Sequence, residues 1–162
     1  MAVDCYLSLP TAGALGVASH HRSIIIEPMK RFTVGSYAVL PFDTAHDVDN
    51  MGFLIASKTG DKCIFLTDTP YCKYRFPGLT NVVVEANYSI DLLKANTDLP
   101  TEVKKRVVRN HFSLENVKGF LKANDLRKVE NIHLVHLSNG NSDMARFKRE
   151  IQRLTGIPVY TY

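Results

Sequence analysis

Cysteine is scarce in this sequence, with three residues in a chain of 162. Cys5, Cys63 and Cys72 form an odd count without paired spacing, which excludes a disulfide framework and a zinc-knuckle pattern. We interpret them as reduced thiols of a cytoplasmic protein. No apolar run has the length of a transmembrane helix, and the N-terminus lacks a charged-then-apolar signal region. We therefore expect a cytoplasmic protein that does not enter a membrane.

The sequence also lacks several common motifs of nucleotide and acyl chemistry. It contains no Gly-Lys-Ser/Thr phosphate loop, no Gly-x-Gly-x-x-Gly and no Gly-x-Ser-x-Gly elbow. P-loop hydrolases, Rossmann dehydrogenases and α/β-hydrolases in their usual forms are thereby excluded. The composition, 45% hydrophobic and 22% charged, is typical of a globular protein. A formal net charge of +4 permits a nucleic acid or phosphate-bearing partner without requiring one.

The pattern along the chain predicts one α+β domain over residues 1–162 with a mixed sheet. A Gly-Asp tip at residues 60–61, between two apolar runs, predicts a β-hairpin. Strands are expected at residues 3–9, 23–27, 31–35, 37–42, 51–57, 62–67, 80–87, 131–137 and 157–162. Helices are expected at residues 11–17, 89–96, 99–112, 113–126 and 142–156. Ser89, Thr101 and Ser113 stand where helix caps are preferred, and Gly156 ends the last helix.

Polar side chains that suit metal binding occur at the ends of predicted strands. His46 precedes the strand at 51–57, Asp68 follows the strand at 62–67, and His136 closes the strand at 131–137. Neutral imidazole nitrogen and carboxylate oxygen are ligands that suit zinc, manganese or iron in catalytic sites. Strand-end histidines also occur as ordinary hydrogen-bonded loop residues, and spacing alone leaves both interpretations open.

Four motifs give the sequence a resemblance to a known superfamily. They are "DTAHDVDNMGFLI", "IFLTDTPY", "VVVEANYS" and "IHLVHLSNGNSD", in that order. Together they resemble the later motifs of the metallo-β-lactamase superfamily, in the branch of bacterial and phage hydrolases related to DNA exonucleases and other phosphodiesterases. The resemblance covers nearly the whole chain, and the order of the four motifs is more specific than any one of them.

The resemblance implies a set of site residues. His46, Asp68 and His136 would be metal ligands, with Asp68 bridging two ions, and Asp68 and His136 would serve catalysis. Residues expected beside the site are Asp47, Glu85, Asn87, His111, Ser138 and Asn141. His111 belongs to a "His-x-Ser" element at a helix start, and its position is equally compatible with a neighbour of a helix cap. Tyr88 stands where a histidine often follows Glu-Ala-Asn, so one further imidazole is missing.

The same resemblance implies a fold and a chemistry. The superfamily fold is a four-layer α/β/β/α sandwich, of which this chain would form the C-terminal portion, a mixed sheet with flanking helices. The expected cofactor is a divalent metal, zinc or manganese, with two ions in the complete domain. The expected activity is that of a phosphodiesterase or nuclease, acting on nucleic acid or a nucleotide phosphodiester.

The superfamily signature His-x-His-x-Asp-His is absent from this chain. We expect it to lie upstream of Met1, so that this chain alone binds metal weakly and hydrolyses little. A sheet without its first strands would expose edges and an apolar face, which favours association with another copy or with a separate N-terminal segment.

Two other hypotheses remain open. The first is a degenerate, non-catalytic domain of the same fold with a binding or regulatory role. The second is a nucleic-acid-binding module without metal, which would use the basic runs at residues 102–110 and 146–153. These runs lack interleaved aromatic residues and are more typical of solvated helix faces.

Overall fold

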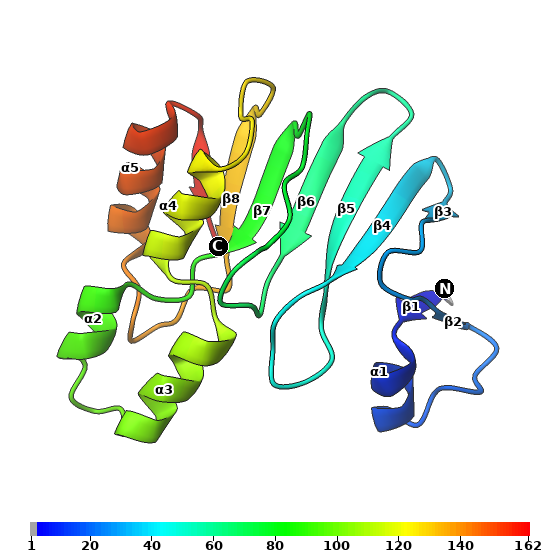
Figure 1. The fold of residues 1–162 in the computed structure, drawn as a ribbon, viewed down its shortest axis with the longest axis horizontal. Coiled ribbons are helices and arrows are strands. Elements are labelled where there is room, and N and C mark those ends of the chain that lie inside the picture. Colours follow the sequence, from blue (N-terminus) through cyan, green and yellow to red (C-terminus); the bar gives the residue numbers. More distant parts are fainter. Residues whose placement is uncertain (1–2) are drawn as a thin grey trace.

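A seven-stranded mixed sheet forms the centre of the protein, as the computed structural model of residues 3–162 shows (Figure 1). The strands lie in chain order across the sheet, from β3 at one edge to β9 at the other. They are β3 (Phe32–Val34), β4 (Tyr37–Asp43), β5 (Met51–Ser57), β6 (Lys62–Leu66), β7 (Asn81–Glu85), β8 (Asn131–Val135) and β9 (Val159–Thr161). Pairs from β3 to β6 are antiparallel and pairs from β6 to β9 are parallel. The predicted α+β class with a mixed sheet is confirmed.

Within residues 3–162, five helices and a small second sheet flank these strands. The helices are α1 (Leu9–Ala14), α2 (Ile90–Ala95), α3 (Thr101–Asn110), α4 (Leu114–Lys122) and α5 (Met144–Thr155). The second sheet pairs β1 (Cys5–Leu7) with β2 (Ser23–Ile25) in parallel. Among the described residues, no helix combines the length and apolarity needed to cross a membrane.

One face of the large sheet packs against α4 and α5 and forms the core. The paired residues Ile64, Val82 and Ile132 are fully buried on this face. The helices contribute a matching set of buried residues: Val117, Phe120, Leu121, Phe147 and Ile151. These positions recur at helical spacing, so each helix presents an apolar stripe to the sheet. The core therefore lies between the helices and the strands that lead to the candidate site.

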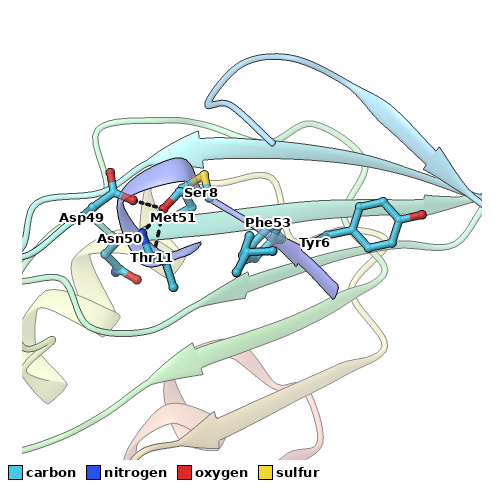
Figure 2. A pocket seen from close by; sticks show the side chains of 8 residues that line it. Tyr6, Ser8, Thr11, Asp49, Asn50, Met51 and Phe53 are labelled. Atoms are coloured by element: carbon cyan, nitrogen blue, oxygen red, sulfur yellow. Dashed lines mark hydrogen bonds between the residues drawn. The ribbon is translucent and has the colours of Figure 1, made fainter. Parts of the chain in front are cut away.

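The opposite face of the sheet is covered unevenly. Over β5, Tyr6 of β1 lies beside Phe53, and both line a small cavity whose polar end contains Ser8 hydrogen-bonded to Asp49 (Figure 2). Toward the other edge, Phe65 is 40% exposed and Tyr160 is 44% exposed. These two rings stand in the same cross-strand row as Phe53. This face is apolar and partly open to solvent.

Of the three N-terminal helix caps predicted from the sequence, one forms a side-chain cap hydrogen bond. Ser113 caps α4 by accepting a hydrogen bond from Asn116 N, as expected. Thr101 was predicted as a cap but is the first residue of α3, and Pro100 occupies the cap position instead. Ser89 occupies the cap position of α2 without a side-chain cap hydrogen bond. Proline at the end of an extended segment starts a helix through its fixed φ angle, so no capping side chain is required there.

We predict that Gly52→Ala destabilises the fold. A Cβ atom at this position would lie 2.3 Å from Cζ of Phe42, which is 1% exposed. Overpacking of this kind costs about 1–3 kcal/mol. Gly119→Ala is the matched control, because its added Cβ meets nothing within 4 Å in α4, and helix propensity predicts a gain of about 0.5–1 kcal/mol. Urea denaturation of both variants measures this difference, and equal stabilities would contradict the packing described for Phe42.

Candidate metal centre

The centre of the site is the fully buried carboxylate of Glu85, the last residue of β7. Its Oε1 atom lies 2.6 Å from Nδ1 of His111 and 2.8 Å from Nδ1 of His136. Its Oε2 atom accepts hydrogen bonds from the backbone N–H groups of Asp68, at 2.8 Å, and Phe112, at 3.2 Å. A carboxylate only accepts hydrogen bonds, so both imidazoles present an N–H to it. Glu85 therefore joins three separate segments of the chain.

The strand order explains why these segments meet. The strands β6, β7 and β8 are parallel neighbours, so their carboxyl ends lie at the same edge of the sheet. Asp68 and His136 follow β6 and β8 and adopt left-handed backbone conformations, with φ of 55° and 54°. The side-chain amide of Asn50 donates to the Asp68 carbonyl at 2.8 Å, and that of Asn87 donates to the His136 carbonyl at 3.0 Å. These bonds hold the chain in turns that bring the two side chains back over the sheet edge.

His111 reaches the same place from the helical side. It is the C-cap residue of α3, and the extended segment that follows pairs with the chain just after β7. Asn87 N donates to the Phe112 carbonyl at 2.9 Å, and Leu114 N donates to the Tyr88 carbonyl at 2.7 Å. The turn between α3 and α4 thus continues the sheet and places the His111 ring above its edge.

Asp68, Glu85, His111 and His136 each offer a ligand atom, and these atoms all lie within 4.8 Å of one another. Oδ1 of Asp68 lies 3.4 Å from Nδ1 of His136 and 3.6 Å from Nδ1 of His111. Ligand atoms of a tetrahedral ion with bonds of about 2.1 Å are separated by about 3.4 Å. Glu85 Oε1 lies closer than this to both Nδ1 atoms and accepts their N–H groups, so it orients the two rings. Asp68 and the other ring nitrogens of His111 and His136 are then the donors that suit one divalent ion.

The charges at this position favour the same conclusion. Glu85 has no lysine or arginine partner among the described residues, and its recorded ion-pair partners are His111 and His136. A buried carboxylate is costly unless it is paired. The carboxylate raises the pKa of His111 mainly through the hydrogen bond between them, against the opposing effect of burial. A divalent cation beside these groups would balance the charges of the buried Glu85 and the partly exposed Asp68.

His46 lines the same cavity but lies outside the group of four. The cavity has a volume of about 390 Å³ and includes His46, Asp68, His111 and His136. The ring centroids of His46 and His111 are 6.2 Å apart, and Nδ1 of His46 lies 2.9 Å from Oδ1 of Asp47. The structure thus brings Asp68 and His136 together and leaves His46 outside the group of four.

Asp47 links His46 to α3. Its Oδ2 accepts a hydrogen bond from Nε of Arg106 at 3.2 Å. A hydrogen bond from Asn110 and the nearby charges of His46 and Arg106 lower the pKa of Asp47. Arg106 also lines the cavity, although its sequence context indicated only a solvated helix face. No local pattern distinguishes Arg106 from the other basic residues of this helix, because only the packing of α3 beside the sheet edge decides which one faces the site.

Ser138 and Asn141 support the loop after β8 rather than the cavity. Ser138 N donates to the Asn87 carbonyl at 3.0 Å, and Asn141 Nδ2 donates to Ser138 Oγ at 3.1 Å. Asn141 Oδ1 accepts a hydrogen bond from Asn96 at 2.8 Å. Neither residue is among those that line the cavity. Asn87, Ser138 and Asn141 therefore hold the backbone that carries His136.

We predict that the metal-free protein loses a stabilising contribution as the pH rises. The pKa of His111 is raised above its ordinary 6.5 in the fold, so the ion pair with Glu85 stabilises fully below that value and is lost as pH increases through the folded pKa. Denaturation in the presence of a chelator, from about pH 6 to about pH 9, measures the effect. The stability advantage of the wild type over His111→Asn should shrink with pH, and an advantage that is constant or grows would refute the ion pair.

Comparisons with known proteins identify the fold. No protein-family model and no curated protein matches the sequence. Solved structures do match. The metallo-β-lactamase fold protein YhfI from Bacillus subtilis aligns with a TM-score of 0.70 and 12% identity over 97% of this chain. CmlA, a diiron β-hydroxylase from Streptomyces venezuelae, aligns with a TM-score of 0.60 and 12% identity over 93% of this chain. A diphosphatase from the PhnP family aligns with a TM-score of 0.58 and 14% identity over 97% of this chain.

These alignments cover only part of each neighbour. The chain spans 61% of YhfI, 35% of CmlA and 54% of the diphosphatase. At identities of 12–14%, the likeness concerns the fold alone. Together with the mixed seven-stranded sheet and its flanking helices, it shows that this chain has a metallo-β-lactamase-like fold.

Proposed function

We propose that this protein is a metal-dependent hydrolase of phosphodiesters, in the exonuclease-like branch that the sequence motifs resemble. The observation that carries the proposal is the convergence of Asp68, Glu85, His111 and His136 at the carboxyl ends of parallel strands. Imidazole and carboxylate donors in this arrangement suit zinc or manganese. The fold neighbours include a diphosphatase and a diiron enzyme, which supports a metal-dependent activity for this chain.

Each side chain has a distinct role in this proposal. Asp68, His111 and His136 would hold the ion, and the Glu85 carboxylate would orient both imidazoles by accepting their Nδ1–H groups. A bound divalent ion lowers the pKa of water to about 7 and stabilises charge on phosphoryl oxygens. Arg106 lies in the same cavity, where its guanidinium can pair with a non-bridging phosphate oxygen. The cavity thus combines a metal centre with a cation of the kind that recognises phosphate.

A second ion is part of the proposal for the complete domain. His46 faces the same cavity as Asp68, and an aspartate oxygen can be shared by two ions about 3.5–4 Å apart. Asp68, His111 and His136 serve the first ion, and His46 is the further imidazole in the cavity that a second ion could use. We therefore expect this chain to bind the first ion more tightly than the second.

We predict that Glu85→Gln lowers the affinity for Zn²⁺ by about 10- to 100-fold, the usual cost of altering a carboxylate that orients metal-binding histidines. The amide removes one charge and turns one accepting oxygen into a donor that faces the imidazoles of His111 and His136. Titration calorimetry measures the affinity. His133→Asn is the control, because its ring stacks on Tyr160, away from the site. A folded wild type that releases no heat with Zn²⁺ or Mn²⁺ would favour the non-catalytic domain instead.

We predict that this chain hydrolyses bis(p-nitrophenyl) phosphate slowly in the presence of metal, and that Asp68→Ala abolishes this activity while leaving the protein folded. Asp68 is 35% exposed in its side chain and supplies a ligand oxygen, whereas its structural hydrogen bonds come from backbone atoms that alanine retains. The assay compares Mn²⁺ and Zn²⁺ with a chelated sample. Unchanged turnover in Asp68→Ala, or equal loss in His133→Asn, would show that the chemistry takes place elsewhere.

A further inference from the structure

A basic groove lies between α2 and α3, on the side of α3 that faces away from the metal centre. It has a volume of about 460 Å³, within the range of ligand sites. Its residues are Leu93, Lys94, Thr101, Lys104, Lys105, Val108 and Arg109. Leu93 is buried and Val108 is 51% exposed, so the groove has apolar surface between its cationic side chains.

The positive charge of this groove is largely uncompensated. Lys94, Lys104 and Arg109 have no recorded ion pair within residues 3–162, and Lys104 Nζ contacts only the Lys94 carbonyl, at 3.4 Å. Lys105 pairs with Glu102 at 2.7 Å, but the two side chains are 61% and 81% exposed. An exposed pair of this kind is weak and can be exchanged for a stronger anion. The net positive charge of the groove therefore favours binding of a negatively charged ligand.

Basic side chains also connect the groove with the metal centre. Arg106 lines the site cavity, while Lys105 and Arg109 line the groove. Residues three and four apart are neighbours on a helix surface, with Cβ atoms about 5–6 Å apart. Arg109 therefore lies beside both Arg106 and Lys105. These three residues form a basic strip that passes around α3 from the site to the groove.

We propose that the α2–α3 groove and this strip bind a single-stranded nucleic acid whose scissile phosphate lies at the metal centre. The choice of ligand rests on the proposed phosphodiesterase function. A row of separate cations matches a ligand with successive phosphates, and the apolar surface of Leu93 and Val108 suits sugar and base rings. A lipid headgroup would place its charge at one point and leave the rest of the strip unused. The groove and the strip therefore favour a nucleic-acid strand over a small phosphodiester.

The test measures binding of a fluorescent single-stranded DNA of about a dozen nucleotides by anisotropy, with a chelator present so that no cleavage occurs. We expect Lys105→Gln/Arg109→Gln to weaken binding about 25-fold at about 0.1 M salt, since each lost phosphate contact removes about 0.7 of a released counterion. The slope of log affinity against log salt concentration should fall by about 1.4.

The control is Arg149→Gln/Arg153→Gln on α5, which removes the same charge at the same helical spacing from exposed positions on another helix. Equal losses in the two double variants, or wild-type affinity in Lys105→Gln/Arg109→Gln, would overturn the proposal. So would binding of anionic phosphatidylserine vesicles that this variant loses while its DNA affinity stays unchanged. Because DNA binding is measured without metal, its outcome is separate from whether Asp68 supports hydrolysis.

Discussion

The structure of the site depends on one buried carboxylate. Glu85 ends a central strand with no exposed surface, and a carboxylate in that position is tolerated only when donors surround it. Its four donors come from the loop after β6, from the loop after β8 and from the junction between α3 and α4. Satisfying Glu85 thus requires these segments to meet at one point. The same requirement places Asp68 and two imidazoles within reach of a common ion.

This arrangement also determines the position of α3. The helix ends at His111, whose ring is held by Glu85, so one face of α3 must line the metal cavity while its other face meets α2. The basic residues of the helix are consequently divided between two sites. Arg106 faces the cavity, and Lys104, Lys105 and Arg109 face the groove. The sequence alone indicated a solvated helix face for these basic residues. Because α3 is held in place at His111, they line two different sites.

The two faces of the sheet differ in how completely they are covered. The face under α4 and α5 is a closed core, whereas the other face carries the small β1–β2 sheet near one edge and exposed aromatic rings near the other. Within residues 3–162, the side chains of Phe65 and Tyr160 in this apolar row therefore remain partly exposed to solvent. The chain spans 61% of YhfI, a protein with the same fold.

Local patterns in the sequence determined most of the secondary structure. The apolar runs at 51–57 and 62–67 and the Gly-Asp tip between them form the predicted hairpin, because alternation and turn propensity act over a few residues. The strand-end positions of Asp68 and His136 were likewise visible from the ends of apolar runs. Thr101 was misjudged as a cap because Pro100 begins α3 through its own backbone constraint.

The family resemblance placed Glu85 and His111 beside Asp68 and His136, but only the tertiary structure decided how these side chains contact one another. Glu85 lies at the end of an apolar strand and His111 at the end of a helix, 26 residues apart, and no spacing rule relates them. The tertiary structure also decided that His46 and Arg106 line the cavity beside the group of four. Hydrogen bonds to a buried charge are formed between segments that are distant in sequence, and their partners are chosen by the parallel order of β6, β7 and β8. Local propensity specifies the elements, whereas burial of Glu85 selects the side chains that meet around it.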